Sequence, residues 1–133
     1  MPSFDDLMGQ SFATMPDLIR AHAASRPDHL AVIDGDRMVT FAELDALVDR
    51  AAAALQRDGV QQLDTVALCG PSSIEYVVIF VAALRGGAAA CPLAPSSTAE
   101  QLAMMVKDCG ARLVFVDDAA SLALASVAEP PAA

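Results

Sequence analysis

Three short apolar stretches separated by helix-like segments restrict the fold of this 133-residue chain more than any other feature. The first, Thr65–Cys69, is an unbroken apolar run typical of a strand covered on both faces in a parallel sheet. Ala88–Leu93 and Arg112–Asp117 are the other two. The resulting order of strand, helix, strand, helix, strand predicts right-handed parallel βαβ units, and hence a doubly wound α/β fold.

A local capping pattern marks where the helices should begin. In this pattern a Ser or Thr accepts the backbone N–H three residues on, and a Glu there reaches back to the cap's own N–H. The pairs that fit are Thr40 with Glu43, Ser72 with Glu75, and Ser97 with Glu100. We expect a helix after each pair. The glycines expected to end these helices are Gly59, Gly86 with Gly87, and Gly110.

Two smaller elements are expected before this alternation. Thr14 should cap a helix over Met15–Ser25. Strands over Leu30–Asp34 and Arg37–Phe41 flank a Gly-containing corner, which predicts a hairpin. The expected divisions of the chain are an N-terminal lead over residues 1–14, an α/β subdomain over residues 15–118, and a weak helix with a Pro-Ala tail over residues 119–133.

Composition excludes several classes of partner. The chain has 8 Lys and Arg against 17 Asp and Glu, a net charge of −9, so it should repel nucleic-acid phosphates and anionic lipid headgroups. The longest apolar run, Tyr76–Leu84, is far shorter than the ~20 residues that span a bilayer. Asp5 and Asp6 stand where a signal peptide carries positive charge, so we expect a cytoplasmic protein.

Residues with metal-binding or catalytic potential are scattered along the chain. Three widely spaced cysteines, Cys69, Cys91 and Cys109, are expected to be buried and reduced. The histidines His22 and His29 have no nucleophile assigned to them, and Met104 and Met105 are expected to fill apolar space. The carboxylate pairs are Asp5 with Asp6, Asp34 with Asp36, and Asp117 with Asp118. Without the spacing of a calcium loop, we interpret these pairs as turn formers and solvated charge.

Two glycine-containing segments are candidate phosphate sites. Gly86 and Gly87 follow a predicted helix, whereas a phosphate cradle precedes one, so we interpret them as a helix end. Cys69–Ser73, reading CGPSS, lies at the carboxyl end of a strand, where open α/β sheets bind ligands. It has one glycine and no lysine, which favours simple helix capping over phosphate binding. We therefore assign no catalytic, cofactor-binding or metal-binding residue.

The order of these pieces resembles the N-terminal region of the adenylate-forming, or AMP-binding, superfamily of acyl- and aryl-CoA ligases and adenylation domains. VTFAELDALVDRAAAAL (residues 39–55) is similar to the family's first core motif, and ALRGGAAACPLAP (residues 83–95) to its second. The resemblance extends from about Pro16 to Asp118. It implies a fold that forms the first part of the large N-terminal domain of an acyl-CoA ligase.

The resemblance implies ATP- and magnesium-dependent activation of a carboxylic acid to an acyl-adenylate, followed by transfer to a thiol such as coenzyme A. The family's phosphate loop, adenine motif, ribose-binding Asp and catalytic Lys have no counterpart in this sequence. The 133 residues alone are therefore expected to be inactive and to pair with the missing remainder of a ligase or with themselves. The segment Ala94–Thr98 departs from the pattern of amino-acid adenylation domains and favours a CoA ligase.

Three alternatives stay open. The first is an amino-acid adenylation domain fragment, and the second is a stand-alone, non-catalytic module that binds another protein. The third is a small flavodoxin-like nucleotide binder that uses the CGPSS segment.

Overall fold

The computed structural model describes residues 2–127 of the chain. Its elements, in chain order, are α1 (Phe4–Met8), α2 (Met15–Ser25), β1 (Leu30–Asp34), β2 (Arg37–Thr40), α3 (Phe41–Arg57), β3 (Thr65–Cys69), α4 (Ile74–Arg85), β4 (Ala89–Pro92), α5 (Ala99–Asp108), β5 (Ala111–Val116) and α6 (Asp118–Ser126).

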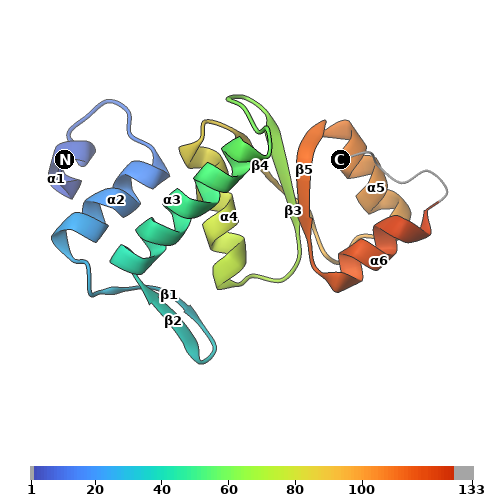
Figure 1. Cartoon of the computed structure of the whole chain (residues 1–133), viewed down its shortest axis with the longest axis horizontal. Helices are drawn as coiled ribbons and strands as arrows, with labels where there is room; N and C mark the ends of the chain where they lie inside the picture. The colour runs from blue at the N-terminus through green and yellow to red at the C-terminus, as the bar shows by residue number, and fades with distance from the viewer. Residues whose placement is uncertain (1, 128–133) are drawn as a thin grey trace.

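A parallel three-stranded sheet divides the molecule into two helical layers. Its strand order is β4-β3-β5, and β3 pairs in parallel with both neighbours. α3 and α4 lie on one side of this sheet, and α5 and α6 lie on the other (Figure 1). The doubly wound α/β fold expected from the sequence is confirmed.

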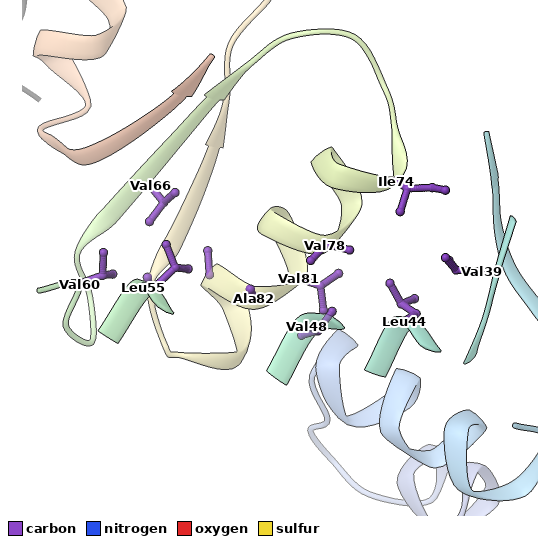
Figure 2. Packing of buried hydrophobic residues seen from close by; sticks show 12 residues of the cluster. Val39, Leu44, Val48, Leu55, Val60, Val66, Ile74, Val78, Val81 and Ala82 are labelled. Atoms are coloured by element: carbon purple, nitrogen blue, oxygen red, sulfur yellow. The ribbon is translucent and has the colours of Figure 1, made fainter. Parts of the chain in front are cut away.

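Each face of the sheet has its own apolar core. On one face, Val66 of β3 belongs to a core formed with α3 and α4. This core includes the buried residues Val48 of α3 and Val81 of α4 (Figure 2). On the other face, Ala67 and Cys69 pack with buried residues of α5 and α6. Alternate residues of β3 thus serve opposite cores, which explains why the strand is apolar throughout.

The N-terminal elements form a lobe against α3. β1 and β2 form the expected antiparallel hairpin, and α2 has the bounds predicted for it, with the Thr14 hydroxyl accepting the N–H of Asp17. α1 was not predicted. It buries Leu7 and begins with a capping box between Ser3 and Asp6, so the lead contains a short helix.

Thr40 caps α3 as expected, whereas the caps of α4 and α5 each lie one residue after the expected serine. The N-cap of α4 is Ser73 instead of Ser72, and the N-cap of α5 is Thr98 instead of Ser97, with Gln101 as its reciprocal partner. At α3 only half of the predicted box forms, because the Glu43 carboxylate accepts the Thr40 hydroxyl and not the backbone N–H.

The strands β4 and β5 run over 89–92 and 111–116, and each end lies within one residue of the expected position. Gly59, Gly87 and Gly110 adopt the positive φ that favours glycine after a helix. The weak helix predicted near the C-terminus is α6, while the Pro-Ala tail lies outside the described residues. No helix among residues 2–127 is long and apolar enough to cross a membrane.

Candidate functional site

The carboxyl end of the sheet carries a hollow of about 240 Å³ at the CGPSS segment. It lies between the loop that follows β3 and the end of β5, and its lining combines apolar side chains with two carboxylates, Glu75 and Asp117. Ser73 uses its hydroxyl to accept the N–H of Tyr76, and Asp117 uses its carboxylate to accept the N–H of Ala120. These groups cap helices, as the sequence indicated for the serines.

The electrostatics of this hollow do not suit a phosphate. Burial raises the pKa of the Cys69 thiol, and the Asp117 carboxylate raises it further, so the thiol stays protonated at neutral pH. Glu75 places negative charge in the first turn of α4 and Asp117 does so at the N-terminus of α6, whereas a phosphate would need free N–H groups or a lysine there. The hollow therefore has the position of a ligand site in an α/β sheet without the groups that hold a nucleotide.

Gly86 and Gly87 end α4 and enter β4. The N–H of Gly86 donates to the carbonyl of Ala82, and the N–H of Gly87 donates to the carbonyl of Leu84. Both donors are therefore used to close the helix. Gly87 also has φ +79°, a conformation that residues with a Cβ rarely adopt. The hydrogen bonds support the interpretation of this pair as a helix end.

The acidic pairs are joined to arginine or to helix ends. Arg37 of β2 donates to both carboxylate oxygens of Glu75, at 2.5 and 2.8 Å, and to Asp34 at 2.8 Å. Asp34 also accepts the first helical N–H of α4, from Ile74, at 3.3 Å. This arginine clamp fixes the hairpin to the start of α4. Because Glu75 is held by Arg37, it does not fold back on Ser72, and the cap moves to the next serine.

The clamp shifts the titration of its members. Hydrogen bonds from Arg37 lower the pKa of Glu75 to about 2 and the pKa of Asp34 below its usual value, with the Ile74 N–H contributing to the latter. Among the described residues, no group of three or more His, Cys, Asp or Glu side chains is placed to hold a metal ion. Asp6 and Asp117 serve as helix caps.

Beside the clamp lies a larger apolar groove that the sequence did not reveal. Its volume is about 620 Å³, and it is bounded by β2, α3 and the first turns of α4. Its lining residues are Arg37, Met38, Val39, Leu47, Ile74, Glu75, Val78 and Ile79. The groove joins segments separated by some forty positions, so only the folded chain brings them together.

The remaining candidates have structural surroundings. His22 lies between the rings of Phe4 and Phe41, each with its centroid 5.0 Å from the imidazole centroid, and this stack ties α1 to α2 and α3. The backbone carbonyl of His29 accepts the N–H of Phe41. Met105 packs on the second core, whereas Met104 is 59% exposed.

All three cysteines are free thiols, as expected, but Cys69 alone is fully buried. Cys91 and Cys109 are half-buried and pack against the core under α5. Burial raises the pKa of Cys91, and the neighbouring thiol of Cys109 raises it further.

A second ionic cluster, also missed in the sequence, joins three helices. Arg85 at the end of α4 is only 12% exposed and donates to Asp45 at 2.8 Å and Asp49 at 2.9 Å, both on α3. It also donates to the backbone carbonyl of Pro16 in α2 at 3.1 Å. Arg20 of α2 contacts the same two carboxylates. The cluster fixes the helical layer on one face of the sheet.

Comparison with known proteins identifies the family. The model of the AMP-binding enzyme family matches residues 19–132 of the chain. The chain belongs to the AMP-binding enzyme family. Within this family it is 37% identical over 103 residues to the probable CoA ligase CCL9 of Humulus lupulus, a match that covers 77% of this chain and 20% of the relative.

A relative of another kind matches equally well. The dimodular nonribosomal peptide synthase of Bacillus subtilis (strain 168) is 38% identical over 96 residues, which is 72% of this chain and 4% of the synthase. Among solved structures, the N-terminal domain of FACL13 from Mycobacterium tuberculosis superimposes with a TM-score of 0.84 and 26% identity, over 90% of this chain and 31% of that one. The chain thus spans a fifth or less of both curated relatives and about a third of the solved domain.

Proposed function

We propose that this chain is the N-terminal scaffold of a carboxylic acid–CoA ligase, which forms an acyl-adenylate and then a thioester. The observation that carries the proposal is its superposition on the N-terminal domain of FACL13 over 90% of its length. A Mycobacterium tuberculosis fatty acyl CoA synthetase matches to a similar extent, with a TM-score of 0.82 and 27% identity. The departure at residues 94–98 from the adenylation-domain pattern supports the same choice.

The residues of this chain do not fit ATP and magnesium. The lining of the hollow at the end of the sheet includes two carboxylates and no lysine or arginine, and the glycine pair uses its N–H groups to close α4. We therefore assign ATP, magnesium and coenzyme A to the remainder of the ligase, and no step of the reaction to residues 1–133. The cytoplasm is the location that we propose for this enzyme, because ATP and coenzyme A are its implied co-substrates.

The missing remainder of the ligase is the partner that we propose for this scaffold. The apolar groove beside the arginine clamp and the hollow at the end of β3 are both open, and their linings are largely apolar. Covering apolar surfaces of this kind with another part of a domain removes them from water and lowers the free energy.

A second candidate is an amino-acid adenylation domain, favoured by the 38% identity to the Bacillus subtilis synthase. One assay separates the two. The polypeptide that contains residues 1–133 together with any continuation in its gene is incubated with ATP, magnesium and panels of carboxylic acids and amino acids. Acid-dependent pyrophosphate exchange followed by a CoA thioester supports the ligase. Exchange with amino acids alone and no CoA thioester supports the adenylation domain.

The 133-residue chain is the matched control in this assay. We expect it to show no pyrophosphate exchange and no thioester formation with any acid. Turnover by the isolated chain would contradict the proposal that it is scaffold.

A further inference from the structure

We propose that Cys91 and Cys109 form a modification site, a dithiol that hydrogen peroxide oxidises to an intramolecular disulfide. The bond would join the end of α5 to β4. Both residues belong to one continuous stretch of chain that runs from β4 to the capping residue of α5, so the site needs no residue from outside this stretch. The inference concerns the chemistry of two side chains and does not depend on the proposed enzymatic function.

The register of the sheet directs Cys91 toward α5 and α6. Cys91 of β4 lies beside Ala67 of β3, which in turn lies beside Val114 of β5. Residues aligned in this way on neighbouring strands point their side chains to the same face of the sheet. Ala67 and Val114 belong to the core under α5 and α6, and Cys91 packs against the same core. The thiol of Cys91 therefore faces the helices that cover this side of the sheet.

The end of α5 holds the thiol of Cys109 over its last turn. Cys109 is the C-cap of α5, and its N–H donates to the carbonyl of Met105 at 3.0 Å. Its thiol donates to the carbonyl of Val106 at 3.4 Å. Cys109 packs against the same core as Cys91, and Val106, which is 1% exposed, is a buried member of that core. Both cysteine side chains are therefore fixed by the layer between the sheet and α5.

The two thiols are direct neighbours. Burial raises the pKa of the Cys91 thiol most, and the charge and hydrogen bonding of the Cys109 thiol raise it further. Hydrogen bonding between two thiols brings their sulfur atoms side by side. A disulfide requires Cβ atoms about 4 Å apart, a spacing that two neighbouring thiols can reach by rotation about their Cα–Cβ bonds. The fold therefore places these two sulfur atoms where a bond between them can form.

The third cysteine differs from this pair in exposure and in its neighbours. Cys69 belongs to the same core but is only 2% exposed. Burial raises the pKa of Cys69, and the charge that raises it further is the Asp117 carboxylate and not a thiol. Cys91 and Cys109 are half-buried, so a molecule as small as hydrogen peroxide can reach them. We therefore expect this pair to react and Cys69 to stay reduced.

The oxidation proceeds in two steps with hydrogen peroxide as the oxidant. Because the raised pKa disfavours the thiolate of Cys91, the thiolate of Cys109 attacks first. The O–O bond breaks, a sulfenic acid forms at Cys109, and the departing hydroxide takes up a proton to become water. Cys91 then loses its proton and attacks the Cys109 sulfur, the S–O bond breaks, and a second water leaves. Two thiols are thereby oxidised to one disulfide while hydrogen peroxide is reduced to two waters.

Peptide mapping of the polypeptide that contains residues 1–133, together with any continuation in its gene, tests the proposal. The folded protein is treated with hydrogen peroxide, the remaining thiols are blocked in denaturant, and tryptic peptides are identified by mass spectrometry. Trypsin cleaves after Arg85 and Lys107, so the three cysteines fall on different peptides. We expect the Cys91 and Cys109 peptides to be joined, with a mass lower by two hydrogens than the sum of the separate thiol peptides. Dithiothreitol should separate them again, and Cys69 should be recovered as a blocked thiol.

Three variants identify the reacting pair. Cys91→Ser and Cys109→Ser should each abolish the joined peptide, whereas Cys69→Ala is the matched control and should retain it. Circular dichroism verifies that each variant is folded, and the mapping of the original sequence stays decisive if one of them is not. Sulfinic or sulfonic acid at either residue of the pair without a joined peptide, a disulfide that includes Cys69, or a disulfide between two polypeptides would overturn the proposal.

Discussion

The loop between α3 and β3 contains a strained residue whose replacement should stabilise the protein. Leu63 has φ +72° and is the non-glycine residue with positive φ among those described. Its side chain is 84% exposed, so it contributes almost nothing to either core. Its N–H donates to the carbonyl of Gly87 at 2.9 Å, a bond that holds the turn in this conformation. We therefore predict that Leu63→Gly raises the free energy of unfolding.

The magnitude follows from two opposing effects. The left-handed conformation costs a residue with a Cβ roughly 1–2 kcal/mol, which glycine avoids. Glycine loses more backbone freedom on folding, which offsets about 0.5–1 kcal/mol of the gain. The net stabilisation is about 0.5–1 kcal/mol, or an increase in Tm of roughly 2–5 °C for a domain of this size. The backbone bond to Gly87 is unchanged, because it does not involve the side chain.

Thermal and urea denaturation of three proteins would test this reasoning. Leu63→Ala removes the same exposed side chain but keeps the Cβ and hence the strain, so its stability should remain within about 0.5 kcal/mol of the original chain. Leu63→Gly should be the more stable of the two variants. Equal stabilities for the alanine and glycine variants would show that backbone strain at this position has no measurable cost.

Three further predictions concern the joints of the fold. Gly87→Ala should destabilise by about 1–2 kcal/mol, because φ is +79° there, whereas Gly86→Ala at φ −80° should be nearly neutral in the same urea titration. The pKa of Glu75 is about 2, below its unfolded value, so its stabilising contribution is complete above about pH 4.5 and is lost as the pH falls toward 2. Arg37→Gln should flatten that part of the stability–pH curve. Arg85→Ala should cost about 2–3 kcal/mol, with Arg85→Lys recovering part of it in urea unfolding; equal losses for both variants would argue against a specific guanidinium network.

The helices and strands of the α/β unit were predictable because their signals are local. An apolar run such as Thr65–Cys69 and a hydroxyl residue before an amphipathic segment specify an element without reference to distant residues. The choice between overlapping caps was not predictable. Ser73 replaces Ser72 because Glu75 is bound by Arg37, which is 38 positions away in the sequence. α1 was missed because five residues have little helical stability of their own and depend on burial of Leu7.

The site was predicted only in part, for a related reason. Sequence position correctly identified the end of β3 as the edge of the sheet where a hollow lies. It could not show that Glu75 of α4 and Asp117, which follows β5, would both line that hollow, since proximity across a sheet depends on strand order. The strain at Leu63 has no sequence signal at all, because leucine is an unremarkable residue in a loop.

Three arginines link the carboxylates of this chain into contacts between helices and strands. The chain has only eight Lys and Arg residues against seventeen Asp and Glu residues, so carboxylates outnumber the cations that can pair with them. Arg20, Arg37 and Arg85 each contact two carboxylates, and every one of these contacts joins different elements. Binding a triphosphate with any of them would require breaking a tertiary contact, and for Arg37 it would also leave Asp34 and Glu75 without their arginine partner. The same contacts that build the scaffold therefore make these arginines poor nucleotide ligands, and a ligase built on this segment would need to draw its phosphate-binding groups from other residues.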